Sequence, residues 1–310
     1  MSNALTSVLK HKAINGWNLF WMIALPMSIM MIVVMMGVDM STGPGVSIMI
    51  GFSVRWAVPF IYLVVAASAV QTLFPGPFPA WWLRNRKYIG LCFAVAMAWQ
   101  GTFIFMLSNF YREHYYDNLY LLRDQLEGSI GYIFLTAMVV TSFQFGRKRL
   151  SLMQWKVLHR SALYFLFAYP FSVYWWAISY YGNPTLIDYV FYWCGFTAFA
   201  LRIVAWGKKR TQAARKIVPE SSVPPGLKAL GGTVFAIGLL ASVATLYTQD
   251  QITNFLTAPQ WSAELVLWLP FWPFEPYLSL FIMGLGTMMF TKVSASTEQS
   301  RVTALDPQTE

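Results

Sequence analysis

The chain has 310 residues, of which 57% are hydrophobic and only 11% are charged, and its formal net charge is +9. Because soluble domains contain about 45–50% apolar residues, this composition excludes an ordinary soluble domain and predicts an all-α integral membrane protein. The basic residues gather beside the ends of apolar runs, so the positive charge indicates membrane orientation and contact with anionic lipids. Nucleic-acid binding is therefore not expected.

Eight apolar runs are long enough to be read as membrane helices, since roughly 17–25 apolar residues cross about 30 Å of hydrocarbon. In chain order, the expected spans cover residues 17–38, 53–74, 88–109, 129–146, 157–181, 187–206, 230–248 and 277–291. The first run follows Lys10 and Lys12, but it is too long for a signal-peptide core and no small-residue cleavage site accompanies it. We therefore expect it to be a retained anchor.

Basic and acidic residues alternate between successive loops. The basic loops contain Arg84, Arg86, Lys87, Arg147, Lys148, Arg149, Lys208, Lys209, Arg210, Arg215 and Lys216, and the acidic loops contain Asp39, Glu113, Asp117, Asp124, Glu127, Asp250, Glu264 and Glu275. Since cytoplasmic loops are enriched in Lys and Arg, the basic loops are expected to face the cytoplasm. An even number of spans then places both termini there, in a multi-pass protein of the bacterial inner (plasma) membrane.

The expected spans divide into a unit of six and a trailing pair. We expect a cytoplasmic tail over residues 1–16, a six-span membrane domain over 17–206, a cytoplasmic linker over 207–229, two extra spans with an aromatic outer loop over 230–291, and a disordered cytoplasmic tail over 292–310. The polar residues 1–15 are also expected to be disordered. Residues 110–128 are expected to form a short outer helix. The Trp- and Pro-rich residues 258–276 are expected either to anchor in the membrane interface or to dock an outer partner.

The sequence lacks the motifs that are typical of several classes of membrane and nucleotide-binding proteins. No expected span carries Asp or Glu near its middle, which disfavours a proton-driven pump, and the chain has no internal repeat of the kind found in secondary transporters. It contains no phosphate-binding glycine loop and no dinucleotide fingerprint, so no flavin or nicotinamide domain is expected. Cys92 and Cys194 fall inside expected spans without metal-binding spacing.

Three stretches together carry a family pattern in matching order and spacing. They are Arg84, Arg86, Tyr88, Gly90, Leu91, Phe93 and Ala94; Gly131, Tyr132, Leu135, Thr141 and Ser142; and Trp155, Leu158, His159, Arg160, Tyr164, Pro170 and Trp175. With these residues, the region 17–206 resembles the ferric-reductase-like family, and most closely the haem-binding membrane subunits that serve a periplasmic methionine sulfoxide reductase. The resemblance implies a six-helix ferric-reductase-like bundle, to which this chain adds two C-terminal transmembrane helices.

The resemblance also implies a cofactor site. In that family, b-type haem is held between the third and fifth helices by one histidine from the third helix and two from the fifth. Carried over to this chain, one ligand position is His159, but the other two are Gln100 and Ser172. The usual bis-histidine haem site is therefore degenerate. A methionine such as Met97 or Met153 is an alternative axial ligand, although methionine is also common in apolar helices.

The residues of the degenerate site have two interpretations each. His159 is either the surviving axial ligand of a single inner haem b or a packing imidazole, bonded to a carbonyl or a lipid phosphate beside Arg160. Gln100 stands at a vacated ligand position and needs hydrogen-bond partners inside a membrane, which Ser172 or Thr102 would supply. Such bonds would fill part of the vacated haem space.

These expectations favour a membrane subunit of a redox system, at most the membrane component of an oxidoreductase. It would take part in electron transport between a cytoplasmic flavoprotein or quinol donor and a periplasmic redox partner. The alternative is a haemless membrane protein that retained the bundle, with a structural, assembly, or small-molecule or lipid-binding role. No catalytic residue is assigned from the sequence.

Overall fold

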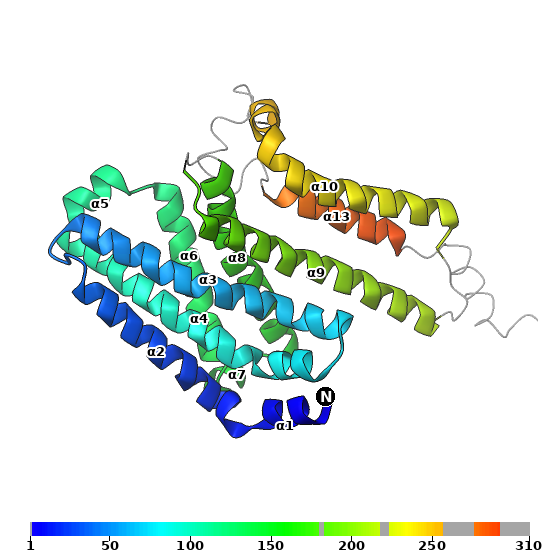
Figure 1. Cartoon of the computed structure of the whole chain (residues 1–310), viewed down its shortest axis with the longest axis horizontal. Coiled ribbons are helices and arrows are strands. Elements are labelled where there is room, and N and C mark those ends of the chain that lie inside the picture. The colour runs from blue at the N-terminus through cyan, green and yellow to red at the C-terminus, as the bar shows by residue number, and fades with distance from the viewer. Residues whose placement is uncertain (1, 180–182, 218–222, 257–275, 292–310) are drawn as a thin grey trace, which may run out of the picture.

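The computed structural model describes residues 2–179, 183–217, 223–256 and 276–291, and every regular element in them is a helix (Figure 1). In chain order these are α1 (Ser2–Lys10), the 3-10 turn η1 (Lys12–Ile14), α2 (Gly16–Met36), α3 (Gly43–Leu73), α4 (Pro77–Phe110), α5 (Arg112–Asn118), α6 (Leu122–Thr141), α7 (Gln144–Arg147), α8 (Leu152–Ser179), α9 (Leu186–Ile217), α10 (Pro225–Leu256) and α13 (Tyr277–Phe290). The prediction of an all-α protein is confirmed for these residues.

Five of the described helices are long and apolar enough to cross a membrane, namely α2, α3, α4, α9 and α10. The chain is therefore a multi-pass membrane protein. Helices α6 and α8 lie where the fourth and fifth spans were expected, and the shorter apolar helix α13 lies where the eighth was expected. The division into six spans plus two stays a prediction.

Some helices, among them α3 and α9, extend well beyond the apolar runs that predict them. Helix α3 begins at Gly43 instead of residue 53, because the Thr42 hydroxyl caps it by accepting a hydrogen bond from the backbone N–H of Gly45 at 3.3 Å. Helix α9 continues to Ile217, so the first half of the expected linker 207–229 is helical. Hydropathy marks where apolar residues end, whereas Lys, Gln, Ala and Arg extend a helix well beyond that point.

The N-terminal segment is ordered, which makes the prediction of disorder over residues 2–15 wrong. The Asn15 side chain accepts hydrogen bonds from Arg84 Nη2 at 2.8 Å and from Asn85 Nδ2 at 2.9 Å, both at the start of α4. The indole of Trp81 donates to the carbonyl of Ile14 at 2.9 Å. Composition could not reveal these contacts, because the acceptors are a single side-chain amide and a backbone carbonyl. Their donors lie on α4, about 70 residues further along the chain.

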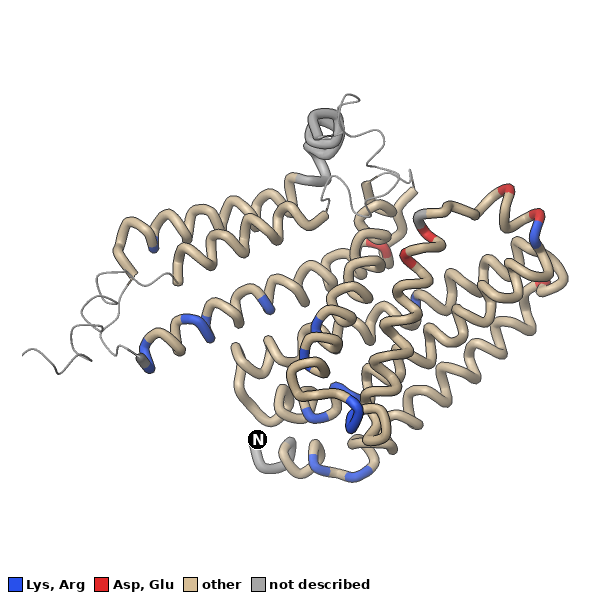
Figure 2. The backbone as a smooth tube through the Cα atoms, turned by 180° about the vertical axis from the view of Figure 1, so that it is seen from behind, with Lys and Arg blue, Asp and Glu red and all other residues tan. Residues whose placement is uncertain are grey.

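Neighbouring helices run in alternating directions, so the charged loops collect at two ends. Figure 2 shows most Lys and Arg residues gathered at one end of the helices and most Asp and Glu residues at the opposite end. We call the first the basic end, defined by Arg84, Arg86, Lys87, Arg147, Lys148, Arg149, Lys208, Lys209 and Arg210. The structure thus keeps the charge separation that the sequence indicated.

Helices α3 and α4 pack along each other, with α2 against α4 and α9 against α3 (Figure 1). Helix α8 packs against α9, α6 and α3. The core where they meet contains the fully buried rings of Phe167, Phe171 and Trp175, all on α8. Helices α4 and α8 do not pack closely along each other, and the space near their basic ends is the cavity described below.

A short outer helix was expected within residues 110–128, and an interfacial or partner-docking segment over residues 258–276. Residues 110–128 do contain a short helix, α5, which is held to α3 by a 2.7 Å hydrogen bond from the Tyr111 hydroxyl to the carbonyl of Met40 just before it. The expected aromatic outer segment 258–276 lies outside the described residues except for Pro276, and the expected tail 292–310 lies outside them entirely.

The C-terminal helices α10 and α13 pack backbone to backbone through glycines. A Cβ atom placed on Gly238 of α10 would lie 2.7 Å from the backbone nitrogen of Met283 on α13, and one on Gly231 would lie 2.8 Å from the carbonyl oxygen of Gly286. Small residues allow this approach, and van der Waals packing is a main source of helix association in lipid. Helix α13 of this pair lies against α9, where Gly207 faces Thr287.

We expect Gly238→Ala to destabilise the protein by about 1–3 kcal/mol, because the added methyl group overpacks the contact with α13. Gly232→Ala is the matched control, since it lies on the same helix with open space around it and gains helix propensity. Thermal unfolding in one detergent would compare the two. Equal midpoints for both variants would contradict the backbone contact.

Candidate functional site

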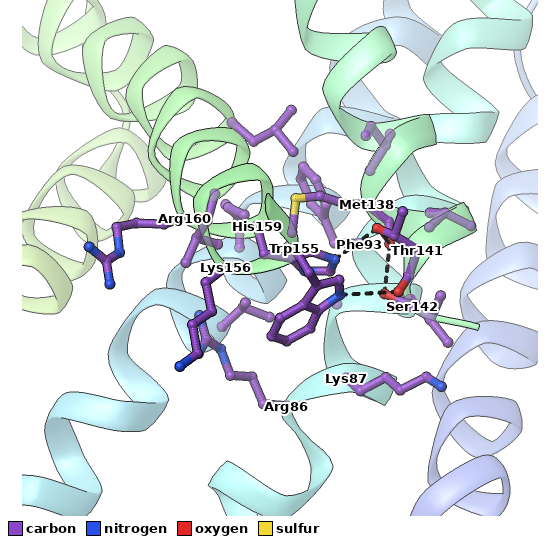
Figure 3. Close-up of a pocket in the computed structure, with 18 of the residues that line it drawn as sticks. Arg86, Lys87, Phe93, Met138, Thr141, Ser142, Trp155, Lys156, His159 and Arg160 are labelled. Atoms are coloured by element: carbon purple, nitrogen blue, oxygen red, sulfur yellow. Dashed lines mark hydrogen bonds between the residues drawn. The ribbon is translucent and has the colours of Figure 1, made fainter. Parts of the chain in front are cut away.

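A cavity of about 630 Å³ lies near the basic end, between α4, α6 and α8, with α3 and α9 closing it (Figure 3). Its inner wall is apolar and comprises Ile61, Val64, Phe93, Leu135, Leu163 and Leu166. This volume falls within the range of about 300–1,000 Å³ that is typical of ligand sites. The cavity is therefore large enough for a small organic molecule or for part of a lipid.

Positive charge surrounds this cavity without an acidic counterpart. The cations that line it are Arg86, Lys87, Arg147, Lys156, Arg160 and Arg202, and none of its described lining residues is Asp or Glu. Like charges in contact with an apolar wall repel one another more strongly than they would in water. An anion in the cavity would offset that repulsion. We refer to this site as the basic cavity.

Arg86 is a cation of the basic cavity that makes no hydrogen bond to the described protein residues. It lies near the start of α4, its side chain is half-buried, and no described residue accepts a hydrogen bond from its guanidinium. It is also close enough to Arg202 for their charges to repel. The N–H groups of Arg86 are therefore free to bind a ligand with negatively charged oxygens.

His159 lies on the wall of the basic cavity, and its ring is turned toward α6. Its Nε2 is 2.9 Å from the hydroxyl oxygen of Thr141, and that hydroxyl donates its hydrogen to the carbonyl of Ala137 at 2.6 Å. With its one hydrogen given to Ala137, the Thr141 oxygen accepts from Nε2, and this arrangement assigns the proton of the neutral ring to Nε2.

Trp155 fixes the ring of His159 from the side of the basic loop. The two ring centroids are 4.4 Å apart, and the indole N–H donates to the carbonyl of Thr141 at 3.2 Å. The guanidinium of Arg147 lies 5.3 Å from the Trp155 ring and donates to the carbonyl of Leu150 at 2.7 Å. Figure 3 shows Trp155 and His159 both reaching toward Thr141 from α8. The imidazole is thus held by two neighbours on different elements.

The structure brings together only part of the site expected from the sequence. His159 and Arg160 both line the basic cavity. Gln100 instead accepts a hydrogen bond from the Tyr132 hydroxyl at 3.2 Å, and Ser172 donates to the Tyr277 hydroxyl at 3.4 Å. The expected bond between Gln100 and Ser172 is therefore wrong.

The expected partner Thr102 is also engaged elsewhere, because its hydroxyl donates to the carbonyl of Ala98 at 2.9 Å within α4. Ser172 is reached by Tyr277 of α13, whose hydroxyl also donates to the carbonyl of Ala168 at 2.7 Å. The sequence could not show this contact, because it joins residues 105 positions apart in the chain.

Haem b fits this arrangement only in part. An apolar wall with a basic rim suits a porphyrin that carries two carboxylates. Axial ligation does not fit, because Nε2 of His159 faces Thr141 and because Gln100 and Ser172 are bonded to tyrosines away from it. Within the described residues, no cluster of three His, Cys, Asp or Glu side chains that could hold a metal ion is found.

The sequence did not lead us to predict that most of the residues lining this cavity belong to one binding site. It assigned Arg86 and Arg147 to membrane orientation and did not single out Met138, which lines the cavity beside His159. The available signal was the placement of basic residues just inside the ends of apolar runs on several different helices. Only the fold shows that these helix ends converge.

Comparisons with protein-family models, with characterised proteins and with solved structures found no match to this chain. The resemblance to the ferric-reductase-like family therefore stays a prediction. The cavity itself is the firmest basis for a functional proposal.

We expect Thr141→Val to destabilise the protein by about 1–3 kcal/mol, since it leaves the Nε2 proton of His159 without its acceptor. Thr141→Ser keeps the hydroxyl and serves as the control. Nitrogen NMR of the labelled imidazole should show a protonated Nε2 in the neutral ring of the unmodified protein, with His159→Gln used to assign the signal. A protonated Nδ1 with a bare Nε2 would contradict the hydrogen-bond arrangement.

Proposed function

We propose that this protein resides in the bacterial inner membrane, with its basic end and both termini in the cytoplasm, and binds an anionic amphipathic ligand in the basic cavity. One observation carries the proposal: the cavity joins an apolar wall to a rim of six cations without a carboxylate among its described lining residues. A neutral ligand would leave the repulsion between these cations in place, and a small inorganic anion would leave the apolar wall unused.

The position of the cavity supports a lipid-like ligand. Its cations stand near the basic ends of α4 and α8, where the apolar part of each helix gives way to charged loops. Lipid phosphates lie at that depth in a bilayer, and basic pockets between membrane helices bind anionic headgroups. Arg86 and Arg202 would meet phosphate oxygens, while Leu163 and Leu166 would contact acyl carbons.

We expect the double variant Arg86→Gln/Lys156→Gln to lose about tenfold or more in affinity for phosphatidylglycerol, because each cation near a membrane anion contributes about 1 kcal/mol. Native mass spectrometry of the detergent-solubilised protein, titrated with this lipid, measures the bound fraction. Phosphatidylcholine, which is zwitterionic, should bind weakly to both forms.

The matched control is Lys148→Gln/Arg149→Gln. It removes the same charge from the same basic end, but neither residue lines the cavity and both are exposed. An equal loss of phosphatidylglycerol in the two double variants would assign binding to the surface and overturn the proposal.

As a second function, we propose that the chain is the membrane subunit of a redox system. The supporting observation is that His159 lines a cavity between α4 and α8, which lie where the third and fifth spans were expected. By the resemblance to the ferric-reductase-like family, these spans would be the ones that hold haem. Its donor would be a cytoplasmic flavoprotein or quinol, and its acceptor a periplasmic redox protein. His159 is the one histidine among the described lining residues of the cavity, so the bis-histidine ligation of that family cannot be formed from them.

A visible spectrum of protein purified from haem-replete cells separates the two functions. If this redox function holds, a stoichiometric Soret band is present and His159→Ala removes it, whereas His159→Ala should leave phosphatidylglycerol binding within about twofold. A colourless, folded protein would exclude the haem-dependent form and leave the lipid-binding or assembly role.

A further inference from the structure

A second cavity of about 500 Å³ lies beside the basic cavity, between α3, α8 and α9. Lys209 lines it together with Ser68, Tyr164, Phe199 and Trp206, so it again combines cationic and aromatic surfaces. None of its described lining residues is Asp or Glu. Two basic cavities of similar size therefore stand side by side.

Arg160 and Arg202 line both cavities and thus form the wall between them. In Figure 3, His159 points toward Thr141 on α6, while Arg160 leaves α8 in the opposite direction. Arg160 thus lines the second cavity as well as the basic cavity, whereas His159 lines the basic cavity alone. Arg160 is exposed, so its guanidinium is accessible to a ligand.

Arg202 is held in place by neutral acceptors alone. Its guanidinium donates to the Tyr164 hydroxyl at 2.8 and 3.2 Å, to the carbonyl of Val65 at 3.0 Å and to the Ser68 hydroxyl at 3.4 Å. These four hydrogen bonds orient the side chain and leave one of its five N–H groups free. They do not neutralise its charge, which therefore remains available to anions on either side.

We infer that the two cavities together bind one phospholipid with two phosphate groups, a diphosphatidylglycerol, with one phosphate in each cavity and Arg160 and Arg202 between them. This inference rests on the proposed lipid-binding function and specifies its ligand. Two separate monoanionic lipids would have to be ordered independently at neighbouring sites. Linking the two phosphates in one molecule makes the second binding event intramolecular and raises its effective concentration.

The test compares diphosphatidylglycerol with phosphatidylglycerol at equal total phosphate, using native mass spectrometry of the full-length protein in detergent. The unmodified protein should bind diphosphatidylglycerol at least about tenfold more tightly, by the effective-concentration effect of the linked phosphate. Lys209→Gln removes a cation from the second cavity alone and should reduce this preference several-fold, while leaving phosphatidylglycerol binding to the basic cavity within about twofold.

Arg215→Gln is the matched control, because it removes one exposed cation from the same helix and lines neither cavity. Equal affinity for the two lipids, or an equal effect of Lys209→Gln and Arg215→Gln, would overturn the inference and leave the proposed function standing. Failure of both lipids to bind would overturn the inference and the lipid-binding proposal together.

Discussion

The main constraint on this structure is a set of like charges held around the basic cavity. Arg86, Arg160 and Arg202 come from three helices, α4, α8 and α9, and the described residues around the cavity provide no carboxylate to balance them. Such a cluster costs free energy in a medium of low dielectric constant. A membrane protein can retain such a cluster of cations because basic residues at the cytoplasmic ends of its helices set its orientation. A bound anion would also offset the repulsion between them.

The apolar core determines how closely those charges approach. Phe167 and Phe171 on α8 pack into the same core as α3 and α9, and the two rings stack with centroids 5.4 Å apart. Helices α8 and α4 do not pack closely along each other, and near the basic end the space between them stays open beside Leu163 and Leu166. The same packing that fills the half of the bundle away from the basic end therefore leaves a ligand-sized space near the basic end.

Composition and periodicity were sufficient to predict the helical membrane fold, because twenty or so consecutive apolar residues have few stable alternatives in a bilayer. They were insufficient for the ordered N-terminal segment, which depends on Asn15 meeting the first turns of α4. They also could not predict that Gln100 and Ser172 would bond to Tyr132 and Tyr277, since a hydrogen bond between distant residues requires the relative rotation of whole helices.

The sequence by itself determined the membrane class of this protein, the approximate places of its helices and the separation of basic from acidic loops, because these depend on local composition. Only the tertiary structure decided that His159 bonds to Thr141 and that cations from several helices surround two adjoining cavities. The physical reason is that convergence depends on how long helices pack and rotate against one another. No local pattern of residues encodes that packing.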